Sequence, residues 1–152
     1  MNPEHTYVKA TLEGTTYILA EALVESVLGT EGVEIVSKFA GKELCGTEYE
    51  PLFTCAKVDK KGFFVVADDY VTLTDGTGIV HIAPTFGADD AKVARLAGVP
   101  GLQVVDKNGD LQAQVDLRGR FFCVEDLDPE YAAANMAPEY AEWAGRYVKN
   151  AY

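Results

Sequence analysis

The stretch 75–96 reads DGTGIVHIAPTFGADDAKVARL and combines a tight turn, a short apolar run and a helix start. Asp75 and Gly76 favour a tight turn, because glycine adopts positive φ without steric cost. The run 79–83 is short and rich in β-branched residues, which predicts a buried strand. Pro84 ends this strand, because proline lacks the N–H that a strand ladder requires.

A helical pattern follows the loop after Pro84. Asp89 and Asp90 fall in its first turn, where carboxylates suit the free N–H groups and the positive end of the helix dipole. Gly98 is a suitable terminator. The apolar residues spaced for one helical face are Val93, Leu96 and Ala97. The stretch thus predicts turn, strand, loop and helix, and places His81 and two acids in apolar surroundings as the candidate site.

The composition limits the class of protein. The chain has 152 residues, 48% of them hydrophobic, and a formal net charge of −11. This length fits one domain with a real core, and no apolar run approaches the roughly 20 residues of a transmembrane helix. The N-terminus lacks an apolar signal core, which predicts a cytoplasmic chain. The negative charge argues against general affinity for nucleic acid, because phosphate binding depends on Lys and Arg.

The remaining pattern predicts an α+β fold with a barrel-like or curved, mostly antiparallel sheet and a few peripheral helices. Asp128 is a suitable N-cap for a helical region near the C-terminus, with Pro129 as its first residue. The predicted strands are 6–12, 15–19, 33–39, 63–67, 102–105, 111–115 and 120–124, and a helix is predicted at 20–28.

The sequence does not favour a phosphate loop, a metal site or a nucleophilic serine. The Gly-Thr-Gly turn (residues 76–78) precedes a strand and is not followed by Gly-Lys-Ser/Thr, so it does not fit a phosphate loop. Two histidines and three cysteines without a C-x-x-C pair furnish a metal site poorly. No G-x-S-x-G is present for a nucleophilic serine. His81 is either a hydrogen-bonded core residue or a functional one, and Asp89 and Asp90 are either plain helix-start acids or functional.

At these residues the chain resembles a known family. Residues 75–84, continuing through Phe86 and Gly87 to Asp89 and Asp90, closely resemble the editing domain inserted into isoleucyl-tRNA synthetases. Valyl and leucyl enzymes carry related domains, and the histidine followed by Ala-Pro favours the isoleucyl member. Further stretches that share the resemblance are 39–46, 49–52 and 63–71.

The resemblance implies a single editing domain, residues 1–152, excised from a longer synthetase chain. Such a domain hydrolyses the ester of tRNA(Ile) wrongly charged with valine. Its expected partners are the acceptor end of this tRNA and the remainder of the synthetase, with no membrane or DNA partner. No metal or cofactor is implied.

The resemblance also assigns roles to residues. The acid nine residues after the motif histidine holds the α-ammonium group of the misattached amino acid, and this acid is Asp90. His81 is expected to line the pocket near the amino acid or the terminal ribose, and Asp89 is the second choice for the acid. The residues expected to bind the substrate are Tyr70, Gly76, Thr77, Gly78, Phe86 and Asp89.

Two alternatives remain open. The family's threonine-rich segment, which forms part of the pocket wall, is not found in residues 1–17. A non-catalytic module that docks the aminoacylated acceptor end is therefore the first alternative. The second is the related valyl-type editing domain, which acts on threonine esters.

Overall fold

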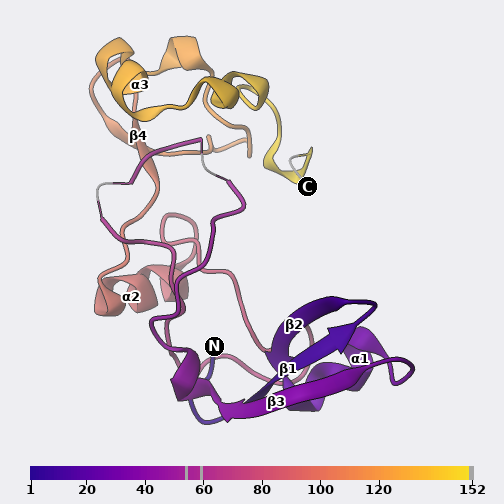
Figure 1. Ribbon diagram of the computed structural model, residues 1–152. Coiled ribbons are helices and arrows are strands. Elements are labelled where there is room, and N and C mark those ends of the chain that lie inside the picture. Colours follow the sequence, from indigo (N-terminus) through magenta and orange to yellow (C-terminus); the bar gives the residue numbers. More distant parts are fainter. Residues whose placement is uncertain (54, 59, 151–152) are drawn as a thin grey trace. The chain divides into compact units, whose positions relative to one another are not determined.

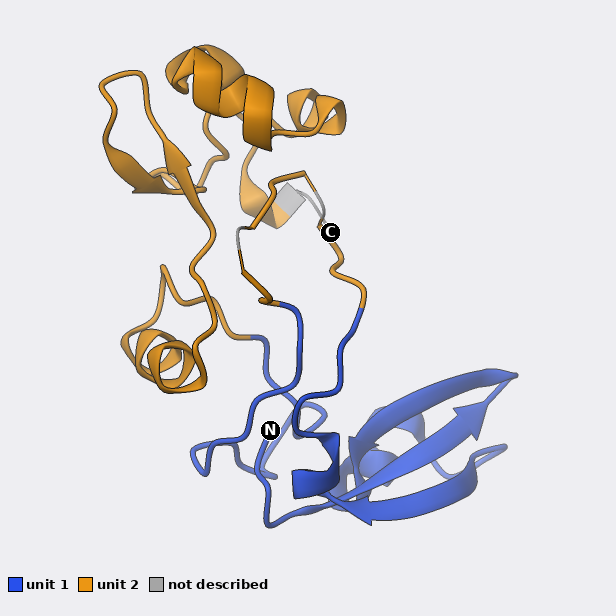
Figure 2. Cartoon of the chain, turned by 60° about the vertical axis from the view of Figure 1, so that its left-hand side comes forward, with its two compact units in different colours: residues 1–49, 63–81 blue, residues 50–62, 82–152 orange. Residues whose placement is uncertain are grey.

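A computed structural model describes residues 1–53, 55–58 and 60–150. The chain forms two compact units, each built from two segments of sequence (Figure 2). Unit 1 comprises Met1–Tyr49 and Phe63–His81, and unit 2 comprises Glu50–Gly62 and Ile82–Tyr152.

Unit 1 contains a three-stranded antiparallel sheet in the order β2-β1-β3 (Figure 1). Its strands are β1 (Thr6–Leu12), β2 (Thr15–Ala20) and β3 (Glu34–Ala40). Glu13 and Gly14 connect β1 to β2, both with positive φ, which matches the twist of the two strands. The predicted hairpin and the third strand are therefore confirmed.

Both faces of this sheet carry apolar residues. On one face, Val8 and Leu19 pack against residues of α1 (Val24–Leu28), which follows the short 3₁₀ helix η1 (Glu21–Leu23). On the other face, Tyr7 belongs to a second cluster, whose other buried members are Met1, Ala20, Leu23 and Leu44. The 3₁₀ helix η2 (Gly41–Leu44) extends this second cluster.

Unit 2 combines helices with a small sheet and long irregular segments. Its helices are α2 (Ala88–Ala97) and α3 (Pro129–Asn135), and a two-stranded sheet pairs β4 (Gln103–Val105) with β5 (Leu111–Ala113). Asp128 caps α3 by accepting a hydrogen bond from the Tyr131 amide, as predicted. The short 3₁₀ helices are η3 (Val124–Asp126), η4 (Pro138–Glu142) and η5 (Val148–Asn150). The buried members of the core are Cys55, Val104, Phe121, Leu127 and Tyr140.

Three predicted strands are wrong. Residues 63–67, 79–83 and 120–124 form no regular strand, and only isolated bridges occur there, such as the one between Glu48 and Phe64. Among the described residues the strands do not close into a barrel, so the fold is α+β with small antiparallel sheets.

The predicted apolar face of α2 is also partly wrong. Val93 and Ala94 are buried, whereas Leu96 is 75% exposed. Gly98 ends the helix in the left-handed conformation, as predicted. Among the described residues, no helix has the length and apolar character needed to cross a bilayer.

Candidate functional site

Asp90 is the candidate residue with the most defined geometry. It lies in the first turn of α2, three residues after the N-cap Gly87. Its side chain turns back toward the preceding loop, and Oδ2 accepts a hydrogen bond of 3.1 Å from the Ala83 amide. The carboxylate is half-buried, and no hydrogen bond to Oδ1 is found among the described residues. Asp90 therefore has one carboxylate oxygen fixed by a backbone amide.

A tight turn brings the Ala83 amide close to the helix. The Ala83 carbonyl accepts hydrogen bonds from the amides of Phe86 at 2.9 Å and Gly87 at 3.3 Å. Pro84 is the second residue of this turn, a position that its fixed φ favours. Backbone hydrogen bonds thus connect the turn directly to the start of the helix over residues 83–90.

The other two candidates of this segment are exposed. The Phe86 side chain is 58% exposed, and Asp89 points to solvent from the first turn of α2. Among the described residues, Asp89 makes no side-chain hydrogen bond like the one that fixes Asp90. Of the two acids, Asp90 is the one with a fixed carboxylate, and its functional role stays a prediction.

The Gly-Thr-Gly turn lies in unit 1 and is anchored through its carbonyl groups. The Thr77 carbonyl accepts from the Ala20 amide at 2.9 Å, and the Gly78 carbonyl accepts from the Tyr7 hydroxyl at 2.7 Å. Gly76 and Gly78 have φ of 66° and 72°, which glycine adopts without strain. The predicted turn is confirmed, and these contacts give it a structural role in unit 1.

Tyr70 and His81 are the remaining candidates, and both belong to unit 1. The Tyr70 side chain is 39% exposed, and its amide donates to Oδ1 of Asp68 at 3.1 Å. His81 is exposed and lies outside any strand, so it is not a core histidine. The pairing of His81 with Asp90, which belongs to unit 2, stays a prediction.

Asn2, the residue that anchors the segment around Tyr70, was not predicted from the sequence. Nδ2 of the buried Asn2 donates to the carbonyls of Asp69 and Val71, at 3.2 and 3.3 Å. These contacts join residues 67 and 69 positions apart. A paired polar group is the usual state of a buried amide, but its partners cannot be read from spacing.

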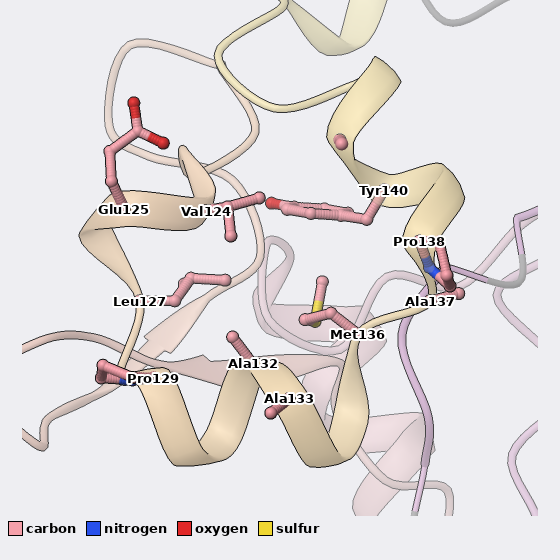
Figure 3. A pocket seen from close by; sticks show the side chains of 11 residues that line it. Val124, Glu125, Leu127, Pro129, Ala132, Ala133, Met136, Ala137, Pro138 and Tyr140 are labelled. Carbon is pink, nitrogen blue, oxygen red and sulfur yellow. The ribbon is translucent and has the colours of Figure 1, made fainter.

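An apolar hollow of about 560 Å³ lies in unit 2 (Figure 3). Leu127, Met136 and Tyr140 face into it, and the Glu125 carboxylate points away. Burial raises the pKa of the Tyr140 hydroxyl, which donates to the Phe122 carbonyl at 2.8 Å. The hollow contains none of the predicted site residues and offers little for acid–base chemistry.

In the described part of the chain, no three histidine, cysteine or acidic side chains gather where they could hold a metal ion. The three cysteines are free thiols, of which Cys55 is buried. Burial raises the pKa of the Cys55 thiol, which disfavours the reactive thiolate. The chemistry available around Asp90 is therefore that of a carboxylate and backbone amides.

Comparison with known proteins relates this chain to longer enzymes. No protein-family model matches it. It is 40% identical over 164 residues to the isoleucine–tRNA ligase of Bacteroides fragilis, an alignment that covers 97% of this chain and 14% of that protein. The isoleucine–tRNA ligase of Porphyromonas gingivalis is 50% identical over 120 residues, covering 78% of this chain and 11% of that protein. The corresponding ligase of Clostridium kluyveri is 42% identical over 134 residues, covering 88% of this chain and 13% of that protein.

Over nearly its whole length the chain is therefore homologous to a segment of aminoacyl-tRNA ligases. The particular ligases that it matches are those for isoleucine, and the similarity to the Bacteroides protein extends over nearly all of the chain. The chain spans only 14% of the length of that relative. The resemblance to isoleucyl-tRNA synthetases is confirmed, and the assignment to their editing domain stays a prediction.

Proposed function

We propose that this chain is the editing segment of an isoleucine–tRNA ligase, which removes misattached valine from tRNA(Ile) by ester hydrolysis. The observation that carries the proposal is the half-buried carboxylate of Asp90, held at the start of α2 in a segment homologous to these ligases. A fixed carboxylate with one free oxygen is a suitable partner for the α-ammonium group of an amino-acid ester.

The need for such an activity follows from the energetics of small side chains. A pocket shaped for isoleucine rejects valine by only about 1–3 kcal/mol, and isoleucine–tRNA ligases are the standard example of this limit. A second, smaller pocket that admits valine and excludes isoleucine corrects the error. Overpacking by the extra methylene costs about 1–3 kcal/mol or more, and the two pockets acting in succession multiply their discrimination.

In the proposed mechanism, catalysis depends more on the positioning of the substrate than on the acid strength of a side chain. Asp90 binds the ammonium group through Oδ1, while the Ala83 amide keeps Oδ2 in place. This fixes the ester carbonyl for attack by a bound water, and orientation alone removes a large part of the barrier of such a reaction. His81 orients water or the terminal ribose.

The tRNA partner is expected to bind mainly to the rest of the ligase. The chain has 24 acidic and 13 basic side chains, so phosphates are repelled by its overall charge. Only the acceptor end with its amino acid needs to reach the Asp90 region. The expectation that no metal or cofactor takes part is part of the same proposal.

The test is deacylation of Val-tRNA(Ile) and Ile-tRNA(Ile) by the complete ligase and its Asp90→Ala variant. We expect selective hydrolysis of the valyl ester, reduced about 100-fold in the variant because the ammonium loses its partner. Glu130→Ala, which removes an exposed acid of α3, serves as the control and keeps the parent rate.

Unchanged hydrolysis and selectivity in Asp90→Ala would contradict the assignment of Asp90. Binding of a stable valyl-adenosine analogue without turnover would instead favour a docking module. Preference for a threonyl ester over a valyl ester would indicate an activity of the valyl type.

A further inference from the structure

Gly87 packs directly against the Asp90 carboxylate. A Cβ atom at Gly87 would lie 2.9 Å from Oδ2 and 3.1 Å from Cγ of Asp90. The contact involves the same oxygen that accepts the Ala83 hydrogen bond. Any side chain at position 87 therefore competes with the carboxylate for its present position.

The conformation of Gly87 does not itself require glycine. Its φ is −121° and its ψ is 139°, an extended conformation open to every L-residue. Serine, threonine, aspartate and asparagine are preferred at an N-cap at least as strongly as glycine. The backbone and the helix cap thus allow other residues, and the three atoms nearest to an added Cβ all belong to the Asp90 side chain.

We propose that Gly87 is a positioning residue for Asp90. The proposal rests on the function proposed above and adds a residue to its site. Without a side chain at position 87, the carboxylate folds back over the helix start and binds the Ala83 amide. This leaves Oδ1 directed to the substrate ammonium. A side chain at position 87 displaces the carboxylate. Because the carboxylate binds the substrate ammonium, the ester moves by a similar distance.

Two variants separate this role from helix capping. Gly87→Ala adds a methyl group but weakens the N-cap, since alanine caps poorly. Gly87→Ser adds the same Cβ and provides a good cap. A matched control is Gly62→Ala, because Gly62 has no left-handed φ and the atoms nearest to its Cβ would be those of Pro100 and the Lys60 carbonyl. A capping effect would appear in the alanine variant alone.

The first measurement is kcat/KM for hydrolysis of Val-tRNA(Ile) by the complete ligase. We expect both Gly87 variants to lose about 10- to 100-fold, because small misplacements at a reacting centre have effects of this size. Gly62→Ala is expected to stay within about twofold of the parent, as substitutions away from special sites usually do. Parent-like rates in both Gly87 variants would overturn the proposal.

The second measurement is a double-mutant cycle with Asp90→Ala. In that background the carboxylate is absent, so the added Cβ has nothing to displace. Gly87→Ser should then change the residual rate less than about twofold, whereas independent residues would show the same loss in both backgrounds. Equal losses in both backgrounds would overturn the proposal.

A third measurement needs no activity. The NMR resonance of the Ala83 amide proton reports its hydrogen bond to Asp90 in the 152-residue chain. Asp90→Ala and both Gly87 variants should shift this resonance upfield in common, and Gly62→Ala should not. If Asp90→Ala keeps full hydrolysis but the resonance shifts as expected, the proposed function fails while the contact stands. If Asp90→Ala abolishes hydrolysis and the Gly87 variants neither shift the resonance nor slow the reaction, the role of Gly87 alone fails.

Discussion

The Tyr7 hydroxyl holds the Gly-Thr-Gly turn against the sheet of unit 1. Tyr7 is fully buried, and its hydroxyl donates to the Gly78 carbonyl at 2.7 Å and accepts from the Asn2 amide at 3.1 Å. Burial raises the pKa of this hydroxyl, so it remains a donor at neutral pH. One side chain of β1 thus joins the N-terminal segment to a turn 71 residues away.

Tyr7→Phe is expected to lower the free energy of unfolding by about 1–3 kcal/mol, because it leaves a buried carbonyl without its partner. Urea unfolding followed by circular dichroism measures the change. Tyr17→Phe removes the hydroxyl of a tyrosine that is 41% exposed and should change stability by less than about 0.5 kcal/mol. Equal losses in the two variants would show that the Tyr7 hydrogen bonds contribute nothing of their own.

Sequence reasoning predicted single residues well where their role is local. Asp90 lies in the first turn of α2 and Asp128 caps α3, as the acid and N-cap preferences predicted. The Gly87 contact was not predicted, although it lies only three residues from Asp90. The direction of the Asp90 side chain depends on the loop that supplies the Ala83 amide, and no residue preference specifies that loop.

At the scale of elements, the strands that formed are mostly those with a partner nearby in the sequence. The β1–β2 and β4–β5 pairs are hairpins closed by glycine-containing turns, at Glu13-Gly14 and Asn108-Gly109. The run 63–67 has strand-forming residues, yet Val65 exchanges hydrogen bonds with the loop residues Gly46 and Thr47. Strand propensity depends on context, and the available partner decides the outcome.

The Gly-Thr-Gly turn allows backbone strain to be separated from packing. Gly76→Ala places a Cβ in open space at a φ of 66°, so it costs only the strain, about 1–2 kcal/mol. Gly78→Ala adds similar strain and a Cβ that would lie 2.6 Å from Cβ of Ala20. We expect it to destabilise by about 1–3 kcal/mol more than Gly76→Ala, since overpacking has this cost.

Urea unfolding of the two glycine variants measures this difference directly. The Gly78 carbonyl also accepts the Tyr7 hydrogen bond, so displacement of the turn should additionally change the Tyr7 environment. Equal destabilisation by Gly76→Ala and Gly78→Ala would mean that the turn moves away from β2 without cost.

At the scale of the whole molecule, the α+β class was predictable and the barrel-like sheet was not. Composition and the alternation of apolar and polar residues predict which segments carry apolar faces. The types and order of these segments predict the α+β fold class. Closure of a sheet depends on pairing between distant strands. The described strands form two separate sheets, each within one unit, and the cores are likewise separate clusters. The expected single excised domain stays a prediction.

Two hydrogen-bonded carboxylates are expected to make the stability of the molecule fall at acid pH. Hydrogen bonds from the backbone, first of all from Asp110, lower the pKa of Asp106, and the Arg120 amide does the same for Asp116. Both carboxylates lie in turns of unit 2. A carboxyl whose pKa is lower in the folded state stabilises that state above its unfolded pKa of about 3.9 and loses this effect as the pH falls through the folded value. Unit 2 should therefore become less stable from about pH 5 downwards.

The double variant Asp106→Asn, Asp116→Asn tests this origin of acid sensitivity. It removes both titrating groups while the amide oxygens can still accept some of the turn hydrogen bonds. We expect it to be less stable than the parent at pH 7, with a gap that narrows as the pH falls toward about 3, because the carboxyls of the unfolded parent take up protons there before those of the folded parent. Fluorescence of Trp143, the one tryptophan of the chain, follows urea unfolding of unit 2 at each pH. A gap that stays constant between the two pH values would show that these carboxylates contribute by shape and not by charge.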